Sequence, residues 1–184
     1  LFRSKKEKYF DNTIFVFVGD HGIRYGGSLP YLPKAYAAQG LTCEHVPLLF
    51  YAPKLLQPKR DNRICSQVDV LPSIAGLTKQ SYTNAAFGRN LFDTINPLFQ
   101  FLPVYSNENL AFIIDHDTKT IGMINNDFYF LKNFKTGAEE FVSIVNDKVV
   151  EKNAHTDSIK THLSILTDAY YETAKYLLLN NKKK

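Results

Sequence analysis

The chain has 184 residues, of which 45% are hydrophobic and 14% aromatic, and this is enough for a packed core in a domain of ordinary size. Its formal net charge of +4 is modest, and much of it lies in lysines near the two ends, at residues 5–8 and 182–184. Terminal lysine runs are usually solvated, so nucleic-acid binding is not expected. No apolar run approaches the roughly 18 residues that a membrane-spanning helix needs, so no span is predicted.

Residues 14–18, Ile-Phe-Val-Phe-Val, form an apolar run of strand length that ends in Gly-Asp-His-Gly. A continuous run of β-branched and aromatic residues is typical of a parallel strand that is covered on both faces. Ligands of open α/β sheets bind beyond the carboxyl ends of the strands, where Asp20 and His21 fall. A carboxylate and an imidazole can both bind Zn²⁺ or Mn²⁺. The alternative is a turn without chemistry, because Asp and Gly are common turn residues.

Three later segments give this motif its context. Residues 45–53 read His-Val-Pro-Leu-Leu-Phe-Tyr-Ala-Pro and predict a second apolar strand at 46–51, with His45 immediately before it. Residues 65–77 read Cys-Ser-Gln-Val-Asp-Val-Leu-Pro-Ser-Ile-Ala-Gly-Leu, and residues 87–91 read Phe-Gly-Arg-Asn-Leu. In combination with Gly-Asp-His-Gly, these segments resemble the carboxyl-terminal half of the alkaline phosphatase superfamily. The likeness is to its sulfatase-like branch, which includes lipoteichoic acid synthases and phosphoglycerol transferases, with Ser73 where threonine is usual.

The resemblance implies a function for the residues that match its motifs. Asp20 and His21 correspond to ligands of a divalent metal, which would be Mn, Zn or Ca. His45 stands where the family often has His or Arg, so it either contacts the substrate or metal or supports the loop. The family's nucleophile lies upstream of these motifs and is not in this chain. The expected reaction is phosphoryl or phosphoglycerol transfer or hydrolysis, with sulfate-ester hydrolysis as the alternative. No residue of the loop at 23–44 can be assigned to a group of the substrate.

The chain begins with Leu1 and has only eleven residues before the first motif, so it is expected to be a carboxyl-terminal piece of a longer protein and inactive alone. Its partners would be the upstream part of the same protein and a phosphate or sulfate ester, which in this branch can be lipid-linked. The resemblance also implies that the parent works on the extracytoplasmic face of the membrane or in the periplasm, anchored by upstream helices. The remaining alternative is a non-catalytic interaction module.

Past residue 100 the pattern becomes antiparallel. Short β-prone runs at 110–114, 120–124 and 128–131 are separated by turn signals and predict a meander. A further hairpin is predicted from 141–145 and 148–150. From Thr156 apolar residues recur at helical spacing, which predicts a terminal helix capped by Thr156 or Asp157.

The expected fold is therefore α/β, in two parts. Residues 1–100 form the carboxyl-terminal part of an alkaline-phosphatase-like sheet sandwich, and residues 101–184 a small antiparallel sheet and terminal helix packed on it. Two further sets of residues leave alternatives open. His116, between two aspartates, is interpreted as a turn residue rather than a metal ligand. Cys43 and Cys65 either form a disulfide or remain thiols.

Overall fold

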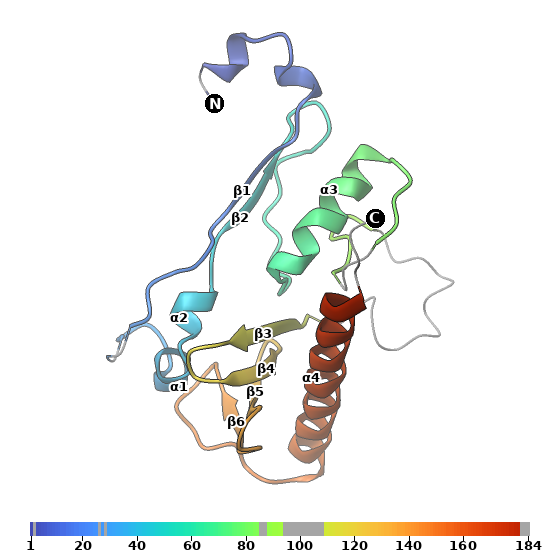
Figure 1. Ribbon diagram of the computed structural model, residues 1–184. Helices are drawn as coiled ribbons and strands as arrows, with labels where there is room; N and C mark the ends of the chain where they lie inside the picture. The colour runs from blue at the N-terminus through green and yellow to red at the C-terminus, as the bar shows by residue number, and fades with distance from the viewer. Residues whose placement is uncertain (2, 26, 28, 85–87, 94–108, 181–184) are drawn as a thin grey trace.

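The computed structural model describes residues 1, 3–25, 27, 29–84, 88–93 and 109–180. Within them, strands β1 and β2 form a two-stranded sheet and strands β3 to β6 a four-stranded sheet (Figure 1). The helices are η1 Ser4–Lys6, η2 Phe10–Asn12, α1 Lys34–Ala38, α2 Leu41–Glu44, η3 Gln67–Asp69, α3 Val70–Thr78 and α4 Ala154–Asn180. The strands are β1 Phe15–Val18, β2 Leu48–Tyr51, β3 Ala111–Asp115, β4 Thr120–Ile124, β5 Phe128–Asn133 and β6 Glu139–Ser143.

The first sheet is a two-stranded antiparallel ribbon, so the prediction of a buried parallel strand at 14–18 is wrong. β1 pairs with β2 from Phe15 opposite Tyr51 to Val18 opposite Leu48. The apolar run correctly predicts a strand of about this length. Its partner β2 runs in the opposite direction, because the chain between them folds back to the end of β1. A continuous apolar run reports hydrophobicity and does not report strand direction.

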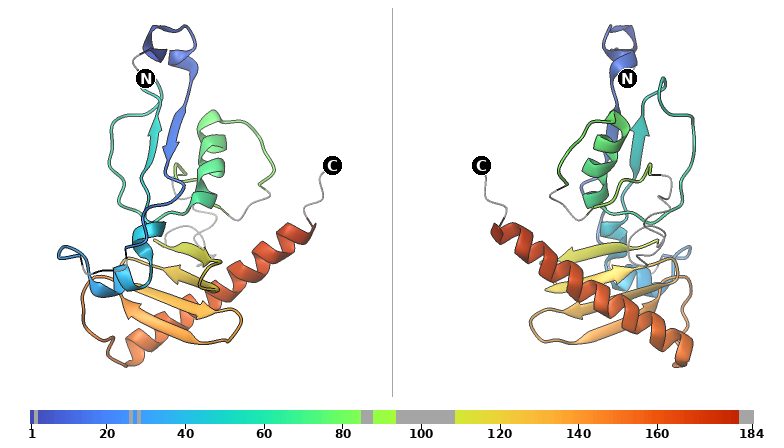
Figure 2. Two further views of the ribbon diagram at one scale, coloured as in Figure 1. Left: turned by 60° about the vertical axis from the view of Figure 1, so that its left-hand side comes forward. Right: turned by 90° about the vertical axis from the view of Figure 1, so that its right-hand side faces the viewer.

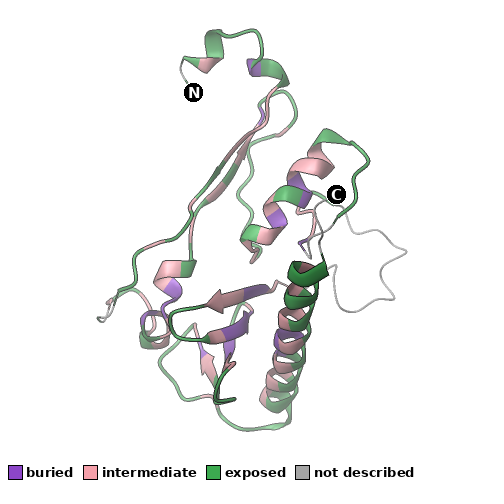
Figure 3. Cartoon of the chain, viewed as in Figure 1, coloured by how far each residue is buried: buried purple, intermediate pink, exposed green. Residues whose placement is uncertain are grey.

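The ribbon is also more exposed than a central strand would be. Phe17 and Val18 are each almost half exposed, at 45% and 46% (Figure 3). Most of the burial lies at the end of the ribbon distant from the second sheet, where the ring of Phe10 lies 5.5 Å from that of Phe15 and 6.1 Å from that of Tyr51. The ribbon is therefore held mainly by its ladder hydrogen bonds and by this aromatic cluster.

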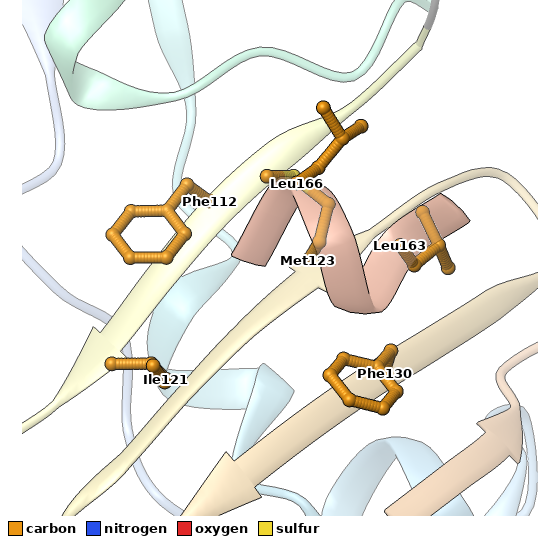
Figure 4. Packing of buried hydrophobic residues seen from close by; sticks show 6 residues of the cluster. All are labelled: Phe112, Ile121, Met123, Phe130, Leu163 and Leu166. Carbon is orange, nitrogen blue, oxygen red and sulfur yellow. The ribbon is translucent and has the colours of Figure 1, made fainter. Parts of the chain in front are cut away.

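The second sheet confirms the predicted meander, because β3, β4, β5 and β6 are neighbours in chain order and all antiparallel. Its side chains alternate between two faces, as strand geometry requires. One face packs against the apolar stripe of α4, which crosses the sheet obliquely (Figure 2). The core between them is shown in Figure 4 and consists of Phe112, Ile121, Met123, Phe130, Leu163 and Leu166.

The other face of the meander receives residues from the α1–α2 segment. Leu41 of α2 is 2% exposed and packs in a second cluster with Ala111, Ile124, Tyr129 and Leu131, with Tyr36 of α1 at its edge. The four-stranded sheet therefore lies between α4 on one face and the α1–α2 segment on the other. This contact fixes the position of the segment that leads into β2.

Two predictions in this half are wrong. Residues 148–150 are not a strand; among the described strands β6 is the edge of the sheet, paired only with β5 through Phe141 opposite Phe130 and Val142 opposite Tyr129. The cap of α4 is Asn153, whose Oδ1 accepts hydrogen bonds from the backbone N–H groups of His155 and Thr156. Thr156 has the reciprocal task, since its Oγ1 accepts from the backbone N–H of Asn153.

The first half begins with the two short 3-10 turns η1 and η2. The predicted boundary at residue 100 and the predicted match at Phe87 lie outside the described residues. Among the helices of the described residues, none has both the length and the apolar character required to cross a membrane.

Candidate functional site

The turn at residues 19–22 lies at the end of the ribbon nearest the meander, and the segment before β2 lies beside it. The backbone N–H of Gly19 donates to the carbonyl of Pro47 at 3.1 Å, and that of Gly22 donates to the carbonyl of Cys43 at 2.6 Å. A Cβ on Gly22 would meet the carbonyl oxygen of Thr42 at 2.3 Å, so a side chain cannot fit there. The antiparallel register brings these segments together, whereas parallel pairing would place His45 at the opposite end of the sheet.

Asp20 and His21 are both exposed and are oriented by local hydrogen bonds. Asp20 Oδ1 accepts from the backbone N–H of His21 at 2.9 Å, and this bond and the nearby imidazole lower the pKa of the carboxyl group. His21 Nδ1 lies 2.8 Å from the carbonyl oxygen of Gly22. A carbonyl can only accept, so Nδ1 carries the hydrogen and Nε2 of the neutral ring presents a lone pair. The bond to Gly22 and the charge of Asp20 raise the pKa of His21.

His45 follows α2 and is exposed, with its Nδ1 2.7 Å from the hydroxyl oxygen of Tyr36. Burial raises the pKa of Tyr36, so this hydroxyl remains protonated at neutral pH. The backbone of His45 lies in the segment that runs beside residues 19–22, and its ring is oriented by α1. The structure therefore brings the segments of all three predicted site residues together, but the ring of His45 is paired with Tyr36.

An ion pair next to this turn connects it to the meander, and Glu44 lies in its field. Arg24 Nη2 lies 2.5 Å from Asp115 Oδ2, at the end of β3. Burial opposes ionisation of Asp115, but the bond from Arg24 and the backbone N–H groups of Thr118 and Asp117 outweigh it and lower its pKa to about 2. Burial and the charge of Asp115 raise the pKa of Glu44, which also contributes to the field at His21. The turn is thus anchored to the meander by an ion pair.

The Ser-Gln-Val-Asp motif supplies a further contact that sequence reasoning did not find. Gln67 Nε2 donates to the backbone carbonyls of Gly19 and Asp20, both at 2.9 Å. Its acceptors are main-chain oxygens, which every residue type has, so the sequence does not reveal this contact. The one indication in the sequence is that Gln67 belongs to a motif of the family resemblance.

The rest of this motif is structural. Asp69 is 4% exposed and accepts from the backbone N–H groups of Ser66 and Arg89, at 2.9 and 2.8 Å, which completes a capping box before α3. Ser73, fully buried, accepts from the backbone N–H of Leu91 at 2.9 Å. These bonds join α3 to residues 88–91, as the predicted succession of the two motifs implies.

The donors of Asp20 and His21 are suitable for a divalent metal, since Nε2 of His21 and the second carboxylate oxygen of Asp20 are of the types that Zn²⁺ and Mn²⁺ bind. A carbonyl bond on the opposite ring nitrogen is the usual way to orient a metal-binding histidine. However, in the part of the chain that the structure describes, three or more His, Cys, Asp or Glu side chains nowhere gather as a possible metal site. Among the described residues, Asp20 and His21 therefore offer two suitable donors, and no third such side chain joins them.

In the part of the chain that the structure describes, the other candidates bring no further ligand to Asp20 and His21. His116 is exposed in the turn between β3 and β4, in agreement with its interpretation as a turn residue. Cys43 and Cys65 are both half-buried thiols and are not joined by a disulfide. Burial raises the pKa of the Cys65 thiol, which disfavours its reactive thiolate form.

Comparison with known protein families agrees with the resemblance over part of the chain. Residues 4–80 match the family model described as Sulfatase, within the alkaline phosphatase superfamily. The match covers less than half of the chain, and it includes β1, the turn at 19–22, His45, β2 and all of α3. Members of this family typically bind a divalent metal. Sulfatase-like character therefore belongs to the first region, and the meander and α4 lie outside the match.

Proposed function

We propose that this chain is part of a metal-dependent enzyme that hydrolyses or transfers phosphate or sulfate esters, with Asp20 and His21 as two of its metal ligands. The single observation that carries the proposal is the orientation of His21, whose Nδ1 is 2.8 Å from the Gly22 carbonyl and whose Nε2 is left to bind a metal. The sulfatase match over residues 4–80 includes this turn and supports the same reading.

A divalent metal, when bound, neutralises negative charge on the transferred group and lowers the pKa of an attacking hydroxyl. In this chain, Asp20 and His21 would hold it. The nucleophile is expected in the preceding part of the protein, as a Ser, Thr or modified Cys. A Ser or Thr would form a covalent ester that water or an acceptor alcohol then resolves.

His45 is proposed to contact the anionic substrate. If Tyr36 donates to Nδ1 over their 2.7 Å separation, Nε2 of His45 carries the hydrogen and can donate to a phosphate or sulfate oxygen. Such donors typically contribute about a hundredfold or more to turnover. His45→Gln should therefore lose most activity at an unchanged melting temperature, and Tyr36→Phe should lose part of it. Turnover within threefold of wild type, with reduced stability, would assign His45 to loop support.

Within this class we favour phosphoryl or phosphoglycerol transfer over sulfate hydrolysis. The support is that Asp-His, not Asp-Asn, follows β1 and that residues 45–53 and 66–72 resemble the lipoteichoic acid synthase branch. The substrate would then be a lipid-linked phosphodiester, and the parent protein would act outside the cytoplasmic membrane. Parallel assays with a phosphodiester and a sulfate ester of the same chromogenic phenol distinguish the two, and an anchored parent should sediment with membranes.

A non-catalytic interaction module is the second candidate, favoured by one observation. The described residues bring no third ligand to Asp20 and His21, so the pair could be a vestige of a lost metal site. A module of this kind would bind no metal at these residues in the full-length protein. Measuring bound metal therefore distinguishes the two candidates in the following experiment.

The deciding experiment compares Asp20→Ala and His21→Ala with matched controls in the full-length protein. Asp11→Ala and His116→Ala alter exposed residues of the same types outside the site. We expect both site variants to lose bound Mn²⁺ or Zn²⁺, measured by elemental analysis, together with esterase or transferase activity, and the controls to retain both. Unchanged metal content and activity in the site variants would refute the proposal.

A further inference from the structure

We propose that Gln67 is a positioning residue for the Asp20–His21 pair. Its side-chain amide fixes the backbone turn that presents both side chains, and so sets the affinity of the site for a divalent metal. This inference rests on the proposed function. Within the Ser-Gln-Val-Asp motif, Ser66 and Asp69 form the capping box before α3, and the inference gives a role to the Gln67 side chain between them.

Both N–H groups of the Gln67 side-chain amide donate to two consecutive backbone carbonyls. Its nitrogen carries two hydrogens, and the oxygens of Gly19 and Asp20 both lie 2.9 Å away. The peptide group between Asp20 and His21 is thereby held at both ends: its carbonyl accepts from Gln67, and its N–H donates to Asp20 Oδ1 at 2.9 Å. Because a peptide group is planar, fixing both ends fixes the orientation of the two residues that it joins.

The backbone of Gln67 is itself rigidly placed. It is the first residue of η3 and lies between Ser66 and Asp69, which form the capping box before α3. Asp69 is buried and receives a hydrogen bond from the backbone N–H of Arg89. The anchored η3–α3 unit therefore contacts the exposed turn at 19–22 through the side chain of Gln67. Gln67 is exposed, so replacing its side chain removes little packing.

The expected effect on metal binding follows from the chemistry of ligands. Groups that orient metal ligands without touching the metal typically change affinity by about 10- to 100-fold when they are removed. Asp20 and His21 are exposed, and their backbone is flanked by the close contacts of Gly19 and Gly22 with residues 42–47. Loss of the Gln67 amide should therefore let the peptide group rotate and spread the two ligands over several orientations.

The test uses Gln67→Met, which preserves side-chain length and neutrality and removes both donors. The matched control is Gln80→Met, an exposed glutamine beyond the end of α3. In the full-length protein, Mn²⁺ affinity is measured by competition with a chromophoric chelator, and amide exchange of residues 19–22 by hydrogen–deuterium exchange. We expect Gln67→Met to weaken Mn²⁺ binding about tenfold or more, to speed exchange in this turn and to leave the meander protected. The control should match wild type.

The outcomes separate this inference from the proposed function. If Asp20→Ala abolishes Mn²⁺ binding but Gln67→Met changes neither affinity nor exchange, the inference is wrong and the proposed function stands. If Asp20→Ala leaves Mn²⁺ binding intact, the proposed function fails, and so does the part of the inference that concerns metal. Weaker binding without faster exchange in the turn, or faster exchange throughout the meander, would also overturn it, because the effect would then not pass through the turn.

Discussion

The ribbon of β1 and β2 and the meander of β3 to β6 are both antiparallel, but different forces hold them. The meander has a helix or helical segment on each face, and its central residue Phe130 is 0% exposed. The ribbon has apolar residues such as Leu49 that are half exposed. It relies on the aromatic cluster at its distant end and on polar contacts at the end that carries the turn. The region with the candidate site is thus the less buried of the two.

This difference indicates where each region is sensitive to change. Ligand-binding segments are commonly drawn from the less stable parts of a protein. Here the turn at 19–22 is held by three polar anchors: the Gln67 amide, the Arg24–Asp115 ion pair and the bonds to residues 43 and 47. Packing substitutions should therefore affect the meander most, and polar substitutions the site region.

The largest effect is expected from Phe130→Ala. Truncating a fully buried phenylalanine typically costs about 3 to 5 kcal/mol of unfolding free energy. Phe17→Ala in the ribbon removes the same group from a side chain that is 45% exposed and should cost about 1 kcal/mol or less. Urea unfolding of both variants measures the difference. Equal losses would contradict the contrast between the two regions.

Asp69→Ala should have the next largest effect. It leaves the backbone N–H groups of Ser66 and Arg89 without their acceptor in a buried position, and each such loss costs about 1 to 3 kcal/mol. We expect a loss of about 3 kcal/mol and faster proteolysis within residues 64–93, while the meander stays resistant. Asp11→Ala, at an exposed aspartate, provides the control. Wild-type protease resistance in Asp69→Ala would show that the motif does not hold this segment.

Asp115→Asn tests the ion pair between the regions through its pH dependence. The folded pKa of about 2 lies below the ordinary value of 3.8, so Asp115 contributes stability above about pH 4 and loses that contribution as the pH falls towards 2. Arg24 is 44% exposed, which reduces the expected contribution to about 1 kcal/mol at neutral pH. The stability difference between wild type and variant should shrink on acidification. A constant difference, or one equal to that of exposed Asp117→Asn, would contradict this.

The smallest effects are expected at two lysines with left-handed backbone conformations, one at the end of α3 and one in the meander. Lys79 ends α3 at φ 54°, and Lys119 lies in the β3–β4 turn at φ 61°. Glycine adopts this conformation without a Cβ clash, so Lys79→Gly should gain about 0.5 to 1 kcal/mol. Lys119→Gly should gain less, because Lys119 Nζ donates to the carbonyl of His116. Thermal unfolding measures both, and a loss at Lys79 would refute the strain argument.

The sequence predicted the elements better than their arrangement. The three strands of the meander at 110–131 and the stripe of α4 are local patterns with clear periods, and the structure confirms them. The direction of β2 relative to β1 depends on how residues 19–47 fold back, which no local pattern records. The extra hairpin at 148–150 does not form and β6 stays at the edge of the sheet, which the local pattern of residues 148–150 does not report.

The site shows the same division. Asp20, His21 and His45 were selected from motifs, and the structure places their segments side by side. The partners that orient them are Tyr36 and Gln67, which act through a side-chain hydroxyl and through bonds to main-chain oxygen. Contacts to the backbone leave no complementary residue type in the sequence, so three-dimensional structure was needed to find them.

The fold of residues 23–42 has a consequence for evolution. This segment leaves Gly22 and returns at Cys43, and a hydrogen bond of 2.6 Å joins these two residues. The segment therefore has a closed base, and lengthening the irregular part of it between Arg24 and α1 costs little free energy, about 0.6 kcal/mol for each doubling. We expect relatives to acquire insertions or deletions in that part without displacing Asp20 or His21. Differences in substrate preference among them should accumulate in the length and composition of this loop, while the spacing from β1 to the turn stays constant.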